Sequence, residues 1–198
     1  MKINIRKENK PSYECMMIAE TSQELSLLAE EDWEKKHHCY TGLIFLAFAV
    51  EAMFIFYRKQ VDPQYVKKDN RTERAVFHKE TLRLCSMPNI TGDTDYQIVR
   101  KCFLIRDSIA HGDTYESSFE HSLPHAPCGD ELIRDVLRVH SEQFRTITYE
   151  LLVKGIEAAK RIDGLICDQG YPLNQKDYDC ELRTHLNPAF GVTGISMW

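Results

Sequence analysis

The sequence lacks the short motifs by which several large enzyme classes are recognised. It contains no GxxxxGK[ST] phosphate-binding loop, no GxGxxG dinucleotide fingerprint and no GxSxG nucleophile elbow. Nucleotide hydrolysis by a P-loop, dinucleotide redox chemistry and serine hydrolase chemistry are therefore not indicated.

The seven cysteines also lack a recognisable spacing. No CxxC pair occurs and the number is odd, so neither a disulfide framework nor a zinc ribbon is indicated. Reduced thiols in the cytoplasm are the simpler interpretation. His121, His125 and Cys128 could offer three zinc ligands, but no fourth ligand accompanies them at a regular spacing. We therefore expect no metal and no cofactor.

Positive charge and long apolar runs are scarce. The chain has 25 Lys and Arg against 30 Asp and Glu, a net charge of −5, which argues against a protein that coats nucleic acid non-specifically. Its long apolar run, residues 42–57, falls short of the roughly 20 residues that a membrane span needs and contains Glu51. We read it as a buried central helix. No signal-type apolar region follows the first residues, so we expect a cytoplasmic protein without a membrane segment.

Apolar residues recur at helical intervals through most of the chain. They predict an all-α fold, a compact bundle of about five helices. The predicted segments are 12–31, with a stripe of Met16, Ala19, Leu25 and Leu28, and then 32–59, 72–85, 96–110 and 130–162. Residues 1–163 are expected to form one helical domain. Residues 164–198 are rich in Pro and Gly but contain Tyr171, Phe190 and Trp198, so we expect an irregular extension packed on the domain or on a partner.

Arg106 and His111 are separated by four residues at and just after the end of the segment 96–110, and Gly112 follows directly. Unpaired carbonyls at a helix C-terminus favour a positively charged imidazole, and Gly is a common helix stop. The spacing alone is weak, because it recurs in looser form at Arg71–His78 and Arg134–His140. A simple C-terminal cap by His111 is the alternative.

The stretch 104–112 (LIRDSIAHG) resembles the signature of the HEPN (higher eukaryotes and prokaryotes nucleotide-binding) superfamily, an Arg followed a few residues later by a His at a helix end. The apolar segment 47–53 (AFAVEAM), with Glu51, is similar to an upstream helix of that family. Together the similarity covers about residues 40–165. It implies a helical ribonuclease that acts as a homodimer with a composite cleft, in a toxin, phage-defence or RNA-processing setting, with a regulatory or antitoxin protein as a possible partner.

An Arg and a His suit metal-independent cleavage of RNA by its own 2′-OH. His111 would move protons, and the forked donors of Arg106 would stabilise charge on phosphorus. One His cannot be base and acid at once, which favours one His from each chain of a two-fold dimer. Asp107 could orient either side chain, and Glu51 could pair with Arg106. This role requires both Arg106 and His111 to be accessible to solvent.

Arg134, Arg138 and Arg145 recur at intervals of four and seven, which would align them on one helical face. They could bind RNA if that face borders His111, and otherwise form a solvated surface. A second class of function also stays open. In it the chain is a non-catalytic HEPN-like module that binds a nucleotide, an RNA or a protein partner.

Overall fold

The computed structural model describes residues 5–7, 10–66, 73–111, 129, 147–191 and 195–197, with side chains placed in 10–66, 73–110, 129 and 147–191. Over these ranges the predicted all-α bundle is confirmed. The described α-helices are α1 (Pro11–Leu28), α2 (Asp32–Val61), α3 (Arg74–Leu84), α4 (Thr94–His111) and α6 (Tyr149–Gln169). Short 3-10 turns are η1 (Pro88–Gly92), η3 (Leu173–Gln175) and η4 (Cys180–Leu182).

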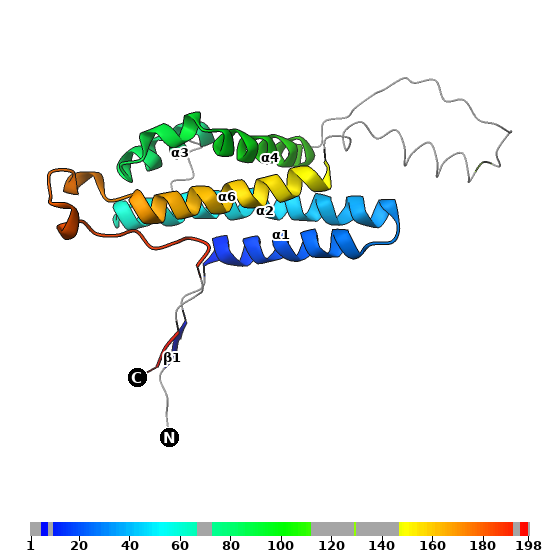
Figure 1. Ribbon diagram of the computed structural model, residues 1–198, viewed down its shortest axis with the longest axis horizontal. Helices are drawn as coiled ribbons and strands as arrows, with labels where there is room; N and C mark the ends of the chain where they lie inside the picture. Colours follow the sequence, from blue (N-terminus) through cyan, green and yellow to red (C-terminus); the bar gives the residue numbers. More distant parts are fainter. Residues whose placement is uncertain are drawn as a thin grey trace.

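The helices are stacked with α2 and α6 in the middle. Figure 1 shows α1 on one side of this pair and α4 on the other, with α3 beside α4. Two short strands, β1 (Ile5–Lys7) and β2 (Ile195–Met197), pair antiparallel, so that Ile5 lies opposite Met197. This strand pair lies beyond the start of α1 (Figure 1).

Helix α2 is the centre of the core, as predicted for the segment 32–59. Its buried apolar side chains are Leu43, Leu46, Ala47, Ala49, Val50, Met53, Phe54 and Tyr57. A helix that is apolar on several sides is stable only when other elements cover it. An 18-residue window of α2, half buried here, has a mean hydropathy of 2.0 and is long and apolar enough to cross a membrane, a test that buried core helices also pass.

Gly42 lies where three helices approach one another closely. A Cβ added there would lie 2.7 Å from Leu152 Cδ2 of α6 and 3.2 Å from Ser22 Cβ of α1. These distances are shorter than ordinary contacts, so a larger residue at position 42 would push α1 and α6 away from α2. The absence of a side chain therefore sets the spacing of this part of the bundle.

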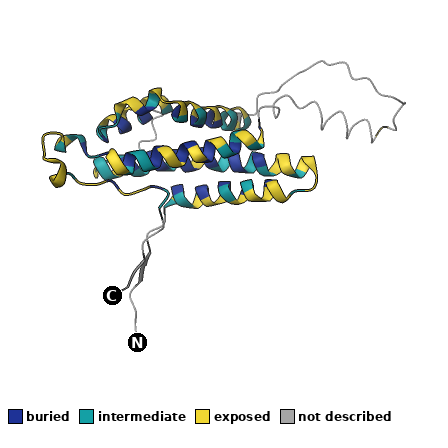
Figure 2. Cartoon of the chain, in the orientation of Figure 1, coloured by how far each residue is buried: buried dark blue, intermediate teal, exposed yellow. Residues whose placement is uncertain are grey.

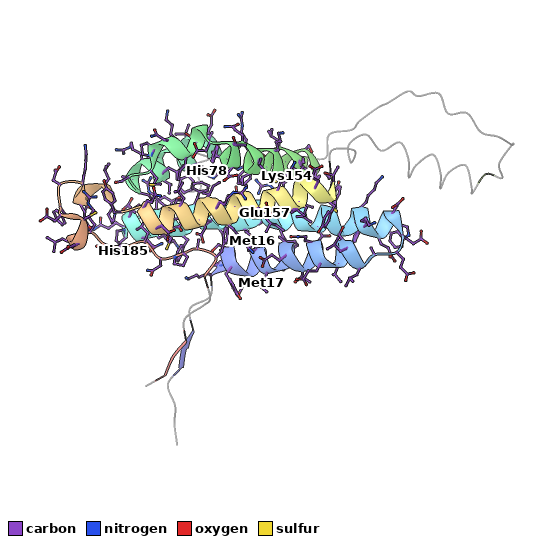
Figure 3. The ribbon with its side chains drawn as sticks, in the orientation of Figure 1. Met16, Met17, His78, Lys154, Glu157 and His185 are labelled. Carbon is purple, nitrogen blue, oxygen red and sulfur yellow. The ribbon has the colours of Figure 1, made fainter. Side chains whose placement is uncertain are left out.

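The predicted apolar stripe of α1 is only half right. Met16 and Ala19 are buried, but Leu25 is 42% exposed and Leu28 is 77% exposed. The buried residues of α1 are Ser12, Met16, Ala19, Ser22 and Ser26. Small residues face inward because α1 packs so closely on α2 that Ser26 Oγ lies 3.1 Å from Cys39 Sγ. Figure 3 accordingly shows Met16 and Met17 on different sides of α1.

Helices α3 and α4 agree with the predicted segments 72–85 and 96–110 to within two residues at each end. The predicted helix 130–162 is wrong in its bounds. Within the described residues, α6 begins at Tyr149, where Thr148 Oγ1 accepts a hydrogen bond from Leu151 N (3.1 Å), and it continues to Gln169. The Thr148 cap defines a helix start that the periodicity did not reveal, and residues 130–146 lie outside the described residues.

The irregular C-terminal segment begins at Gly170, six residues later than the predicted boundary at 164. Its residues 186–190 pack on the helical body around Asp163 of α6. The Asp163 carboxylate accepts hydrogen bonds from Ala189 N (2.8 Å), Phe190 N (3.1 Å) and Tyr57 Oη (2.6 Å), and Ser12 Oγ donates to Ala189 O (2.8 Å). Burial, and then the nearby Asp163 charge, raise the pKa of Tyr57 far above its ordinary value. Trp198 lies outside the described residues.

Candidate functional site

Arg106 projects from the last third of α4 toward α2. Its Nη1 donates to Glu51 Oε2 (2.7 Å), and its Nε donates to Asp107 Oδ1 (3.0 Å). The Glu51–Arg106 pairing considered from the sequence is therefore present, and Asp107 does hold the Arg106 side chain. The side chain of Arg106 is only 11% exposed, so the accessibility expected of it from the sequence is limited. The reason is that α2 and the two carboxylates cover it.

Arg74 at the start of α3 completes the cluster, and no local sequence pattern pointed to it. Its Nη1 and Nη2 donate to the two carboxylate oxygens of Asp107 (2.7 and 3.1 Å), and its Nε donates to Glu51 Oε1 (3.3 Å). Two guanidinium groups thus alternate with two carboxylates. We call Glu51, Arg74, Arg106 and Asp107 the four-residue ion-pair ring. It links α2, α3 and α4, and its formal charge is zero.

Aromatic rings line one side of this ion-pair ring. The Cζ atoms of Arg74 and Arg106 lie 4.6 and 5.8 Å from the centroid of the Phe103 ring, and Arg106 Cζ lies 5.2 Å from that of Phe48. Guanidinium groups are attracted to aromatic faces at such distances. Phe103 is buried, so it also excludes water from one side of both arginines. The rings therefore restrict the directions in which the two guanidinium groups can point.

The ion-pair ring keeps Asp107 and Arg74 charged. Burial by itself raises the pKa of Asp107, but hydrogen bonds from Arg74 and Arg106, with their positive charges, outweigh it and hold that pKa below its ordinary value. Burial by itself lowers the pKa of Arg74, whereas its hydrogen bonds and charge contacts with Asp107 and Glu51 raise it overall. Asp107 and Arg74 are therefore both ionised at neutral pH.

His111 is the last residue of α4, and its side chain lies outside the described side chains. The backbone of α4 stays helical as far as His111. At 100° per residue, positions 106 and 111 differ by about 500°, or roughly 140° around the helix axis. The structure thus brings Glu51 and Asp107 to Arg106, whereas ideal helix geometry puts backbone position 111 on another side of α4. Arg134, Arg138 and Arg145 lie outside the described residues.

His78 of α3 lies close enough to Arg74 to feel its charge, and it is fully enclosed. It stacks on Phe54 at a centroid distance of 3.8 Å, and its Nδ1 lies 3.0 Å from Tyr96 Oη. Burial, and then the charge of Arg74, lower the pKa of His78 to about 3. His78 is therefore a neutral core residue (Figure 3) and not a candidate proton shuttle for a bound substrate.

Metal ligands do not gather in the described part of the chain, where no three His, Cys, Asp or Glu residues are placed to share an ion. His121, His125 and Cys128 lie outside the described residues.

Comparison with known proteins yields no relative. No protein-family model, no curated protein and no solved structure matches the chain. The similarity to the HEPN superfamily therefore depends on the residues of the segments 104–112 and 47–53 alone.

Proposed function

We propose that the chain is a metal-independent endoribonuclease of the HEPN type, with Arg106 and His111 as its catalytic residues. The observation that supports this most is the contact between Arg106 and Glu51, which links the motif helix to the acidic residue of the central helix. Both segments belong to the stretch that resembles the family. The proposed setting is cytoplasmic, in a toxin, phage-defence or RNA-processing system, with RNA as the substrate and a regulatory or antitoxin protein as a partner.

The reaction needs no external nucleophile. The ribose 2′-oxygen attacks phosphorus while a base removes its proton, the bond from phosphorus to the 5′-oxygen breaks, and an acid protonates that oxygen. The products are a 2′,3′-cyclic phosphate and a 5′-hydroxyl, and DNA is spared because it has no 2′-OH. A neutral imidazole serves as the base and a protonated one as the acid.

The ion-pair ring gives Arg106 a fixed direction. A guanidinium has five N–H donors, and hydrogen bonds to Asp107 and Glu51 engage one each on Nε and Nη1, while Nη2 forms an ion pair with Asp107. The guanidinium therefore keeps donors on Nη1 and Nη2 for phosphate oxygens. A guanidinium that is already oriented stabilises developing charge without having to reorganise during the reaction.

Two copies of the chain make the chemistry complete. Arg106 and His111 are about 140° apart around α4, so one copy does not direct both toward the same phosphate. A two-fold homodimer that pairs the ends of two α4 helices places two histidines beside one scissile bond, one as base and one as acid. The composite site is therefore part of the proposal.

A second candidate is a non-catalytic HEPN-like module that binds a nucleotide, an RNA or a protein. The specific observation in its favour is the coverage of Arg106, whose positive charge is already balanced by Glu51 and Asp107. An RNA phosphate would have to compete with both carboxylates. In this case the ion-pair ring is a brace between α2, α3 and α4.

The deciding experiment is cleavage of a mixed pool of single-stranded and structured RNA in EDTA, with DNA of the same sequences as a parallel substrate. The wild type is compared with His111→Ala, Arg106→Lys and the control His185→Ala, whose exposed imidazole lies in the C-terminal segment (Figure 3). The proposal expects cyclic phosphate ends, no cleavage of DNA, loss of activity in the first two variants and normal activity in the control. No cleavage by a folded dimer would favour the binding module, and full activity of His111→Ala would overturn the catalytic role of His111.

A further inference from the structure

Helix α1 carries large apolar side chains on the side that faces away from the bundle. Ile18, Thr21, Leu25 and Leu28 are exposed and follow one another at intervals of three, four and three residues. We call these four residues the outer stripe of α1. Figure 2 shows exposed residues along the outer side of α1 and buried ones on its inner side. Met17, also exposed, widens the stripe.

The outer stripe has the spacing of a helix-pairing seam. With Ile18 and Leu25 at positions a, and Thr21 and Leu28 at positions d, it follows the three-and-four alternation by which helices pack knobs into holes. The inner face of α1 is already occupied, because its small residues pack against α2. Helix α1 buries Ser and Ala against α2 and exposes Ile and Leu, so its outer side is a second surface on which a helix can pack.

The charge of α1 has a single sign. Its charged residues are Glu14, Glu20 and Glu24, and the helix contains no Lys, Arg or His. Glu20 forms an ion pair with Lys160 of α6, whereas Glu14 and Glu24 are exposed and pair with no residue in the described part of the chain. Glu24 occupies position g beside the seam, where coiled coils place the charges that choose a partner.

We infer that the outer stripe of α1 docks an amphipathic helix of a protein partner, with apolar residues at its own a and d positions and Lys or Arg beside them. The apolar stripe supplies the area, and Glu24 beside it selects a basic flank, whereas Glu14, at the position d before Ile18, favours a cation at the end of the partner helix. A second copy of α1 would bring acidic residues to both sides of the seam with no cation from either helix. An anionic membrane surface would be repelled for the same reason. The inference does not depend on the proposed ribonuclease.

The test uses two synthetic helical peptides of four heptads, about 28 residues, with Leu at a and d. One has Lys at e and g and the other has Glu. Binding is measured by fluorescence anisotropy at about 0.15 M salt, where attraction to the net charge alone is screened beyond roughly 8 Å. We expect the Lys peptide to bind the wild type and the Glu peptide not to bind.

Two variants place charge in the outer stripe: Ile18→Glu/Leu25→Glu and, separately, Leu28→Glu. Because these positions are exposed, we expect the fold to be retained, and circular dichroism checks this. Each is expected to weaken binding of the Lys peptide at least tenfold. Leu182→Glu, an equally exposed leucine in η4, is the matched control and should bind like the wild type. Absence of binding by the Lys peptide, or equal binding by all variants, overturns the inference. If sedimentation shows a dimer that Ile18→Glu/Leu25→Glu dissociates, the stripe binds a second copy of the chain. If the wild type floats with phosphatidylcholine vesicles and Ile18→Glu/Leu25→Glu does not, the stripe binds lipid. Either outcome also overturns the inference.

Discussion

Arg106 Nη1 lies 2.7 Å from Glu51 Oε2, although the two residues are 55 positions apart in the chain. This contact joins the end of α4 to the middle of α2, and Arg74 shares both the Glu51 and the Asp107 carboxylates with it. Independently of any activity, the ion-pair ring acts as a brace between three helices. Its contribution to folding can be measured separately from any activity.

The substitution Glu51→Ala removes one hydrogen-bond acceptor of Arg106, whose side chain stays largely buried. Breaking a fully buried ion pair costs about 3 to 5 kcal/mol, but Glu51 is about a third exposed, so we expect a loss of about 1 to 2 kcal/mol in the free energy of unfolding. Urea denaturation followed by circular dichroism measures it.

The matched control is Glu150→Ala, which removes the exposed pair between Glu150 and Lys154 of α6. A solvent-screened surface pair at this spacing contributes little to stability, so Glu150→Ala should lose less than Glu51→Ala. Equal losses in Glu51→Ala and Glu150→Ala would mean that the ion-pair ring is no stronger than a surface salt bridge.

His78 makes the stability depend on pH. Its pKa is about 3 in the folded chain against roughly 6.5 when unfolded, so the unfolded chain binds more protons between these values. Stability therefore falls as the pH drops below about 6.5, with a limiting slope near 1.4 kcal/mol per pH unit. Urea denaturation at several pH values between 6.5 and 5 measures the slope.

His78→Asn should be less stable at neutral pH, because Tyr96 and the buried site lose their fitted partner, but its slope should be flatter. His185→Asn, at an exposed position, should keep the wild-type slope. A His78→Asn profile parallel to that of the wild type would show that other groups cause the acid sensitivity.

The ends of α3 and α4 could be predicted because apolar periodicity and nearby turn residues coincide there. The inward face of α1 could not. Leu25 and Leu28 are the stronger hydrophobic signal, but the close approach of Ser22 to Gly42 decides which side is buried. A property of two packed helices is not visible in the periodicity of one.

Part of the candidate site also could not be predicted from the sequence of one helix. Glu51 and Arg106 belong to recognisable segments, so their pairing could be suggested from the sequence. Arg74 stands 33 positions from Asp107 in a segment without a motif, and only the packing of α3 against α4 brings it to both carboxylates. Arg74 is therefore the residue of this cluster that the structure adds.

Tyr57→Phe tests the attachment of the C-terminal segment. The change removes a hydrogen bond to the buried Asp163 carboxylate, and we expect a loss of about 1 to 3 kcal/mol in stability together with faster proteolysis after Gly170.

The raised pKa of Tyr57 also makes the stability depend on pH. The wild type loses stability as the pH rises above about 10, where an unfolded tyrosine ionises, and Tyr57→Phe should lose less stability over the same range. Tyr178→Phe, at an exposed tyrosine, is the control. Unchanged proteolysis of Tyr57→Phe would show that Ser12 and the apolar contacts hold the segment without it.

Two glycines of α6 should respond in opposite directions to the same substitution. A Cβ at Gly155 would lie 2.6 Å from Leu46 Cδ2 of α2 and 3.2 Å from Cys102 Sγ of α4, whereas a Cβ at Gly164 meets no atom within 4 Å. Gly164→Ala should therefore stabilise by about 0.5 to 1 kcal/mol through helix propensity alone. In Gly155→Ala the same gain is outweighed by overpacking, which costs about 1 to 3 kcal/mol, because Leu46 is fully buried and has little room to move.

Thermal unfolding should show Tm rising for Gly164→Ala and falling for Gly155→Ala, by about 2 to 4 °C per kcal/mol for a chain of this length. A rise in both would mean that α6 can move away from α2 and α4 at little cost, and that the ion-pair ring rather than close packing at Gly155 fixes the position of α4.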